Sequence, residues 1–313
     1  MRQCRQCALR AVDAVKRLIL CADDFAIHAA ASEGIAALAR AGRLSATSAM
    51  VLSPRWAGDA ALLKELRGRI DVGLHLDWTS DFARASGHGL SLRGAMLRAL
   101  LGGFDRAAAR GVIERQLDAF EAVWQAAPDH IDGHQHVQQF AGIREVLVQV
   151  IQARYPATSG VERRPYLRLS SGTASDKRLK TRLIGGMGAT ALARLAGAAD
   201  MASASALSGI YDFEGGVKAY AQRMAHWLND APEAAIVMCH PALHAEAGDE
   251  IGPARAWEYA YLASDAFTQA QAQAGVVLAR GADGLFSLAG GLSGGGSGLG
   301  DGVSGNAGSF GGG

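Results

Sequence analysis

The chain has 313 residues, of which 49% are hydrophobic, so it can bury a sizeable core in one large α/β domain or two small ones. Its 31 basic and 30 acidic residues nearly cancel, and no basic stripe carries interleaved aromatics, so we expect no nucleic-acid partner. No run reaches the roughly 20 apolar residues of a membrane span, and Asp13 and Lys16 interrupt any secretory apolar region, so we expect a soluble protein.

The four cysteines are typical of a reduced, cytoplasmic protein. Cys4 and Cys7 form a C-x-x-C pair, but no second metal-binding pair follows, and the pair precedes the first strand instead of opening a helix. We therefore interpret this pair as incidental. Cys21 and Cys239 lie inside apolar runs and are expected to be buried thiols, which fits a cytoplasmic location.

Short apolar runs alternate with amphipathic stretches along most of the chain. The predicted strands are Arg17–Cys21, Ala46–Leu52, Ile70–Leu76, His130–Gly133, Tyr166–Leu169, Ala235–Cys239 and Val276–Leu278. The predicted helices are Ala30–Ala41, Trp56–Leu66, Arg110–Ala126, Ile143–Ala153, Val217–Asn229 and Ala254–Gln273. Strand followed by helix at this spacing predicts a parallel sheet with helices outside, and the number of units favours a complete or distorted (β/α) barrel over an open sheet.

Composition divides the chain into three parts. Residues 1–15 form an N-terminal extension, residues 16–288 the barrel domain, and residues 289–313 a glycine-rich tail. We expect the tail to be disordered, because it has too little apolar surface to offset its ordering entropy. Within the domain, residues 171–215 are less regular and rich in Ala, Gly and Ser, and we expect an insertion or lid-like region there.

Polar side chains of catalytic type follow most of the predicted strands. Because the carboxyl ends of parallel strands share one rim, where active sites gather, we expect these residues to meet there. They are Asp23, Asp24, His75, Asp132, His134, His136, Arg168 and His240.

The adjacent carboxylates Asp23 and Asp24 follow the first strand. Neighbours in a strand point to opposite sides, so one can bind a metal while the other stays free to take a proton. The alternative is a helix-capping Asp beside a solvated one. The apolar strand before them and the histidines elsewhere favour the functional interpretation.

Histidines supply the remaining metal-type ligands. His75 lies in an apolar strand, where a hydrogen-bonded core histidine is the alternative. In the tract from Asp132 to His136, two histidines at i and i+2 face the same way if the chain stays extended. One Asp with two His is a common metal set, and its chemistry favours zinc or another first-row metal over magnesium.

His240 precedes Pro241, which restricts it to an extended conformation at the strand end. It could protonate a leaving group near neutral pH, and the alternative is a histidine that marks a turn. Five other histidines receive no predicted role: His28, His88, His130, His226 and His244.

Four motifs together resemble the YdjC-like carbohydrate deacetylase family, which includes the ChbG and HpnK deacetylases and is related to NodB-type polysaccharide deacetylases. The motifs are LILCADDF at residues 18–25, VGLHL at 72–76, HIDGHQHV at 130–137 and MCHPA at 238–242. Each motif alone is weak, but four in this order and spacing are specific. The resemblance covers about residues 16–283.

The resemblance implies a distorted (β/α) barrel that removes N-acetyl groups from sugars such as chitin oligosaccharides, with one divalent metal ion, usually magnesium. It implies that the metal ligands are Asp24, His75 and His134. It implies that Asp23 is the general base and His240 the general acid. The identity of the metal stays open between magnesium by resemblance and zinc by ligand chemistry.

The resemblance also suggests that Arg168 orients the general base. Three positions depart from the family pattern: Ala26 stands where a glycine is usual, and Gln135 and Gln138 stand where histidines are common. None of these changes removes a proposed ligand, but the first could alter the turn after the paired aspartates and the others could shift substrate preference.

The predicted function is therefore removal of N-acetyl groups from an amino sugar, either chitin-oligosaccharide-like or lipid-linked. One alternative is another metal-dependent hydrolase on the same barrel, such as a phosphoesterase or amidohydrolase; a phosphoesterase usually needs a second metal or several basic residues at the rim. The other is a non-catalytic sugar-binding protein, whose expected signature is loss of the base or of a ligand. The sequence leaves the oligomeric state open, a homodimer included.

Overall fold

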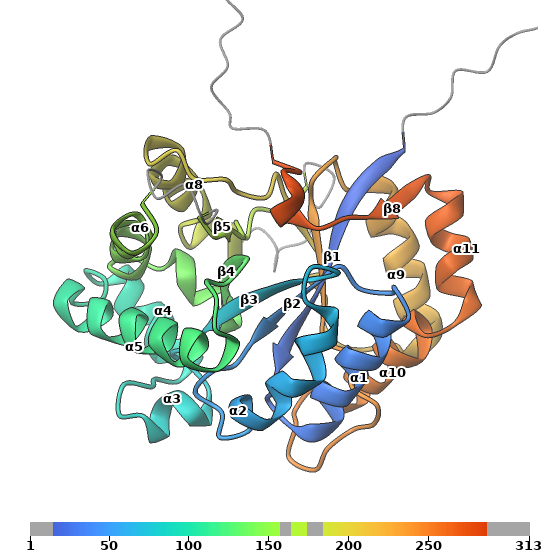
Figure 1. The fold of residues 1–313 in the computed structure, drawn as a ribbon, viewed down its shortest axis with the longest axis horizontal. Coiled ribbons are helices and arrows are strands. Elements are labelled where there is room, and N and C mark those ends of the chain that lie inside the picture. The colour runs from blue at the N-terminus through green and yellow to red at the C-terminus, as the bar shows by residue number, and fades with distance from the viewer. Residues whose placement is uncertain (1–14, 157–163, 174–183, 287–313) are drawn as a thin grey trace, which may run out of the picture.

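The computed structural model describes residues 15–156, 164–173 and 184–286, so the predicted N-terminal extension and glycine-rich tail lie almost entirely outside the described residues. Its strands form one parallel sheet in the order β5-β4-β3-β2-β1-β7-β6, with β8 paired to β1 (Figure 1). The strands are β1 (Lys16–Phe25), β2 (Ala46–Ala49), β3 (Asp71–Leu76), β4 (His130–Gly133), β5 (Tyr166–Leu167), β6 (Leu207–Ser208), β7 (Ile236–Cys239) and β8 (Val276–Leu278).

The sheet curls into the distorted (β/α) barrel that the sequence predicted. Its two edges approach each other through the segment before β6, because Leu167 of β5 donates its backbone N–H to Ala202 (3.0 Å) and accepts one from Ala204 (3.1 Å). Parallel strands need crossover connections, and the chain supplies helices for them.

Helices cover the outside of the curled sheet, with α4, α5, α6 and α8 on one side and α1, α9, α10 and α11 on the other (Figure 1). The helices are α1 (Ala29–Arg40), α2 (Trp56–Asp59), α3 (Asp81–Ala85), α4 (Leu92–Leu100), α5 (Arg106–Trp124), α6 (Ile143–Arg154), α8 (Ala189–Ala198), α9 (Gly216–Asp230), α10 (Gly252–Leu262) and α11 (Asp265–Gln273). Within the described ranges, no helix combines the length and apolarity needed to cross a bilayer.

Strand β1 is the centre of the sheet. Its apolar run is buried, and it pairs with β8 at residues 16–18, with β7 at residues 19–22 and with β2 between residues 21 and 25. Burying aliphatic side chains of this size contributes roughly 1.5–3 kcal/mol each. The strand that carries both aspartates is thus held on both edges.

Three predicted elements end or divide differently in the structure. The second strand ends at Ala49, not at residue 52, and residues 56–66 form one turn of α-helix followed by a 3₁₀ helix at Ala60–Leu66. The last predicted helix is two helices, because α10 ends at Leu262 and Ser264 precedes α11.

The 171–215 segment was expected to be an insertion or a lid-like region, and the structure contradicts only the first of these alternatives. Its described part is not an insertion outside the fold, since α8 packs against α6 and β6 pairs with β7 in the sheet. The sequence analysis also missed α3 and α4. Both carry a serine N-cap, at Ser80 and Ser91, which was the available signal.

Candidate active site

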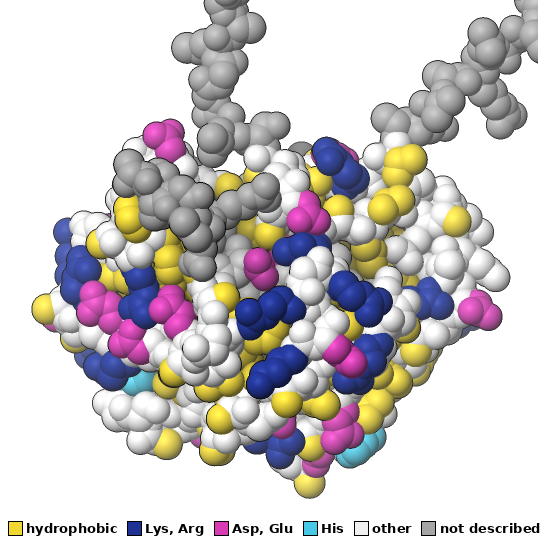
Figure 2. All heavy atoms as spheres, viewed as in Figure 1, with side chains coloured by type: hydrophobic (Ala, Val, Ile, Leu, Met, Phe, Trp, Pro, Cys, Tyr) yellow, Lys and Arg dark blue, Asp and Glu magenta, His cyan; other side chains and the backbone are white. Residues whose placement is uncertain are grey.

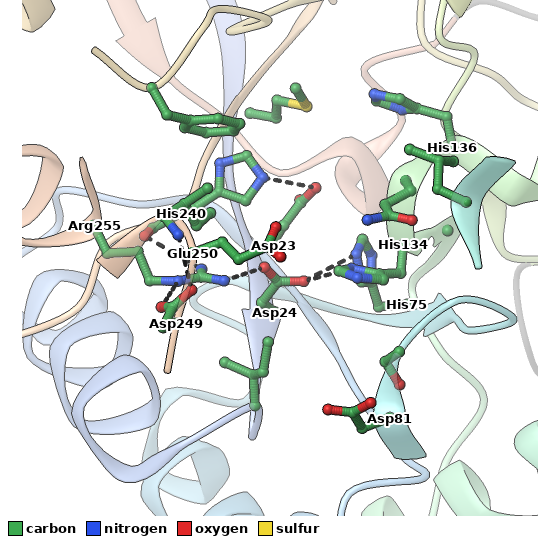
Figure 3. A pocket seen from close by; sticks show the side chains of 18 of the residues that line it. Asp23, Asp24, His75, Asp81, His134, His136, His240, Asp249, Glu250 and Arg255 are labelled. Atoms are coloured by element: carbon green, nitrogen blue, oxygen red, sulfur yellow. Dashed lines mark hydrogen bonds and ion pairs between the residues drawn. The ribbon is translucent and has the colours of Figure 1, made fainter. Parts of the chain in front are cut away.

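A cavity of about 760 Å³ opens at the carboxyl ends of the strands, where the sequence predicted the rim. Its lining includes Asp23, Asp24, His75, His134 and His240, which come from β1, β3, the turn after β4 and the end of β7 (Figure 3). By contrast, both signs of charge are spread over the molecular face seen in Figure 2. The concentration of titratable side chains in one cavity identifies it as the candidate site.

Three side chains converge as a possible metal-binding group. Asp24 Oδ1 lies 3.3 Å from His75 Nε2 and 3.0 Å from His134 Nδ1 (Figure 3), and the three potential ligand atoms lie within 4.8 Å of one another. Asp132 Oδ1 lies 2.6 Å from His75 Nδ1. With its proton on Nδ1, the His75 ring is oriented by that carboxylate and presents Nε2 to the cavity, as metal-binding histidines usually do.

The paired aspartates face different partners because the backbone turns between them. Asp24 has a φ of 64°, in the left-handed region that non-glycine residues rarely adopt. Ala26 has a φ of 72°, in the same left-handed region, which glycine adopts freely and which costs an alanine roughly 1–2 kcal/mol. The predicted effect of this alanine on the turn stays a prediction.

Asp23 is held by a buried arginine. Arg168 Nη1 lies 2.6 Å from Asp23 Oδ1 and 2.9 Å from Asp132 Oδ2, and all three side chains are at most 3% exposed. The other oxygen, Asp23 Oδ2, lies 4.0 Å from His240 Nε2 (Figure 3). Arg168 thus restrains one carboxylate oxygen and leaves the second facing His240.

His240 is framed by groups that the sequence analysis did not identify. Its backbone N–H donates to Glu258 of α10, its Nδ1 lies 3.9 Å from Glu258 Oε1, and Phe213 meets its ring edge to face at 5.3 Å. Burial lowers the pKa of His240 to about 4, although Asp23 and Asp24 oppose this. Burial also raises the pKa of Glu258 to about 7.

Arg255 of α10 is the second residue that sequence reasoning missed. Its Nη2 donates to Asp24 Oδ2 at 2.7 Å and its Nε to Asp249 Oδ2 at 2.7 Å (Figure 3). The side chain is 2% exposed. An arginine and a glutamate three residues apart, on the helix after the His240 motif, were the only sequence signal, and such pairs are common on solvated helices.

The histidine tract does not stay extended, which was the condition for its two histidines at i and i+2 to face the same way. Residues His134–Gln139 form a 3₁₀ helix in which Gln135 and His136 have left-handed backbone angles. As a result His136 Nδ1 contacts Ser170 Oγ at 2.9 Å, and His136 is not part of the Asp24 group. Burial, aided by Arg168, lowers its pKa to about 3.

His28 received no predicted role but lines the cavity. It caps α1 by accepting the Ala31 N–H, and its Nε2 lies 3.2 Å from Asp249 Oδ2.

Electrostatics distinguish the Asp24 group from two other clusters that share Asp132. Burial raises the pKa of Asp24, but Arg255, His134 and His75 outweigh it and hold that pKa well below its usual range. In the cluster of Cys21, His130 and Asp132, burial raises the pKa of the Cys21 thiol well above normal, which disfavours the thiolate that metals bind.

The third cluster joins Asp23 and Asp132 to His75, and both of its carboxylates already share an ion pair with Arg168. The Asp24 group is therefore the better candidate among the described residues.

Fold and site together define an α/β barrel protein with a candidate metal centre at its carboxyl strand ends. The profile of the YdjC-like protein family matches residues 17–273, nearly all of the described chain. The protein belongs to this family, which confirms the resemblance drawn from the four motifs.

Comparisons with individual proteins agree with this assignment. A carbohydrate deacetylase of Homo sapiens is 29% identical over 163 residues, and one of Mus musculus is 32% identical over 165 residues. Each match covers 46% of this chain, and the chain spans about half the length of these relatives, 50% and 52% respectively.

A crystal structure offers a match over a larger share of the chain. It is that of a candidate cellobiose-phosphate cleavage protein from Enterococcus faecalis V583, with a TM-score of 0.65, 19% identity, and coverage of 87% of this chain and 99% of that one. At this identity the likeness concerns the fold alone.

Proposed function

We propose that this protein is a metal-dependent hydrolase that removes the acetyl group from an N-acetylated amino sugar. The observation that carries the proposal is the division of labour between two adjacent carboxylates. Asp24 faces His75 and His134, whereas Asp23 faces Arg168 and His240. Such a site offers separate places for a cation and for a proton acceptor, and the family's curated relatives are named carbohydrate deacetylases.

The chemistry of the donor set fits one divalent cation. Asp24, His75 and His134 offer one carboxylate oxygen and two imidazole nitrogens, and three protein ligands are typical of catalytic sites that keep a position open. The nitrogen ligands favour zinc or another first-row metal, whereas the family resemblance suggests magnesium. When bound, the cation would polarise the acetamide carbonyl and lower the pKa of a water molecule.

The remaining residues of the site would move the protons. Asp23 would take a proton from the attacking water, with Arg168 Nη1, 2.6 Å from Oδ1, holding the carboxylate in place. His240 would donate to the departing amine. Because the pKa of its buried ring is about 4, His240 is neutral at pH 7 and must first receive a proton. Asp23 Oδ2 faces Nε2 at 4.0 Å, beyond direct hydrogen-bond distance, so the two side chains would have to approach each other before the proton that Asp23 has taken could pass to His240.

The wall beside His240 would hold the acetyl methyl group. Ile210, Phe213 and Met238 line the cavity, and the Phe213 ring contacts that of His240. A small apolar wall next to the acid favours an acetamide over a formamide or a charged acyl group, since burying one methyl contributes roughly 0.8 kcal/mol.

The alternatives are less well supported by the contacts. A phosphoesterase needs cationic groups free to meet phosphate, but the buried arginines of this site are each shared by two carboxylates, Asp23 and Asp132 for one and Asp24 and Asp249 for the other. A non-catalytic sugar-binding protein would be expected to lack the base or a ligand, and all the proposed groups are present.

An acetate-release screen tests the proposal. The full chain, supplied in turn with Zn²⁺ and Mg²⁺, would be incubated with N-acetylglucosamine oligomers and with lipid-linked N-acetylated aminosugars. Metal-dependent acetate release is expected, and the Asp23→Asn variant should lose it. Phosphate release from sugar phosphates without acetate release would favour the phosphoesterase alternative. Sugar binding without turnover would favour the non-catalytic one.

A further inference from the structure

Because of Arg255, the two oxygens of Asp24, the carboxylate proposed to bind the metal, have different partners. Its guanidinium holds Asp24 Oδ2 at 2.7 Å, whereas Asp24 Oδ1 faces His75 at 3.3 Å and His134 at 3.0 Å. Asp24 is only 2% exposed to solvent. Within the described residues, Asp24 therefore has one oxygen already engaged in a charge-assisted hydrogen bond and one directed at the histidines.

The same guanidinium reaches the cavity wall. Its Nε donates to Asp249 Oδ2 at 2.7 Å (Figure 3). Asp249 Oδ2 also lies 3.2 Å from His28 Nε2. Asp249 lies in the connection between β7 and α10, of which residues 246–251 line the cavity. Arg255 thus links the first turn of α10, the cavity wall and Asp24 in one rigid, planar fork.

We propose that Arg255 is a positioning residue that makes Asp24 a single-oxygen ligand of the metal and couples its orientation to the cavity wall; this inference rests on the metal site of the proposed function. Attraction of the cation is not its role, because a positive charge beside a metal site opposes cation binding. The bond to Asp24 Oδ2 instead prevents the carboxylate from rotating to offer both oxygens. An open coordination position would then remain for substrate.

Arg255→Lys is the informative substitution because it keeps the charge and removes the fork. An ammonium is a point donor and cannot hold both Asp24 and Asp249 in the same plane. We expect kcat to fall about 10–100-fold, the usual effect of losing a group that orients a metal ligand, while KM stays close to that of the original protein.

The coordination of the metal is measured separately from the activity. Chelator-treated full-length protein would be titrated with Co²⁺, whose visible absorption depends on ligand number and geometry. The Arg255→Lys spectrum should differ from that of the original protein. The matched control is Arg280→Lys, which alters an arginine–aspartate pair (Arg280 Nε to Asp71 Oδ1, 2.9 Å) at the opposite end of β3 and should leave the spectrum unchanged.

If circular dichroism shows that Arg255→Lys does not fold, a second variant tests the proposed role of Arg255. Asp249→Asn keeps the contact between Arg255 and Asp24 but weakens the anchor on the cavity wall, so it should shift the Co²⁺ spectrum in the same direction by less. Unchanged spectra in all folded variants would overturn the inference while leaving the proposed function intact. Failure of the original protein to bind Co²⁺ would overturn both. Co²⁺ binding without acetate release from any sugar would overturn the proposed function alone, with the spectral comparison still deciding the role of Arg255.

Discussion

Replacing Glu258 by glutamine should change how the stability of the protein depends on pH. Glu258 is fully buried, and its carboxylate accepts hydrogen bonds from the Tyr211 hydroxyl (2.7 Å) and from the His240 backbone. Burial raises its pKa from 4.5 to about 7 despite these donors. Between pH 4.5 and about pH 7, the folded protein therefore keeps a proton on Glu258. The unfolded chain has released that proton over most of this range.

The sign and size of the effect follow from this difference. A raised carboxyl pKa means that the contribution to stability is present below pH 4.5 and is lost as the pH rises through 7. At about 1.4 kcal/mol per pKa unit, the free energy of unfolding should fall by about 2–3 kcal/mol between pH 5 and pH 8 on account of Glu258 alone.

Urea denaturation at pH 5 and pH 8, in the presence of chelator, measures this contribution. The fall in unfolding free energy should be about 2–3 kcal/mol smaller in Glu258→Gln than in the original protein. Tyr211→Phe serves as the control, because it removes a donor but keeps the carboxyl group, so the fall should persist. If the original protein and Glu258→Gln respond equally to pH, Glu258 is ionised throughout and this reasoning is wrong.

Three further predictions concern the proposed chemistry. Asp24→Asn should weaken metal binding, whereas Asp23→Asn should keep the metal and slow single-turnover deacetylation by ~10²–10⁴-fold. Elemental analysis measures the metal, and rapid kinetics measure the chemical step. Swapped results would mean that the two roles are reversed, and equal metal loss would mean that both aspartates bind the metal. His75→Ala or His134→Ala should remove metal and activity together while circular dichroism stays nearly unchanged, and full metal occupancy in either variant would exclude that residue as a ligand. Arg168→Met should lower the free energy of unfolding by about 3–5 kcal/mol in urea, because it removes the cation shared by the buried carboxylates of Asp23 and Asp132, and a loss below about 1 kcal/mol would argue against that.

The barrel was predictable because its strands are continuous apolar runs with polar residues directly behind them. That pattern located β1, β3, β4 and β7, and with them the residues that gather in the cavity. Parallel topology then places the strand ends together without further information. The assigned catalytic and ligand roles of Asp23, Asp24, His75, His134 and His240 remain predictions.

Groups outside the strand ends could not be found in the same way. Arg255 and Glu258 lie on a helix, and only the packing of α10 against the end of β7 brings them to Asp24 and His240. The path of the histidine tract also escaped prediction, because left-handed angles at His136 turn its ring away from where an extended chain would place it. Both errors arise where tertiary contacts override the local pattern.

The central position of β1 has a consequence for how the site forms during folding. β1 pairs with β7, and the thiol of Cys239 reaches the carbonyl of Cys21 across 218 positions of the chain. Contacts of such large sequence separation carry a high loop-closure cost and generally form late. We therefore expect Asp23 and His240 to come together only after most of the intervening barrel is ordered. Appearance of activity during refolding should accordingly lag behind the appearance of helical structure.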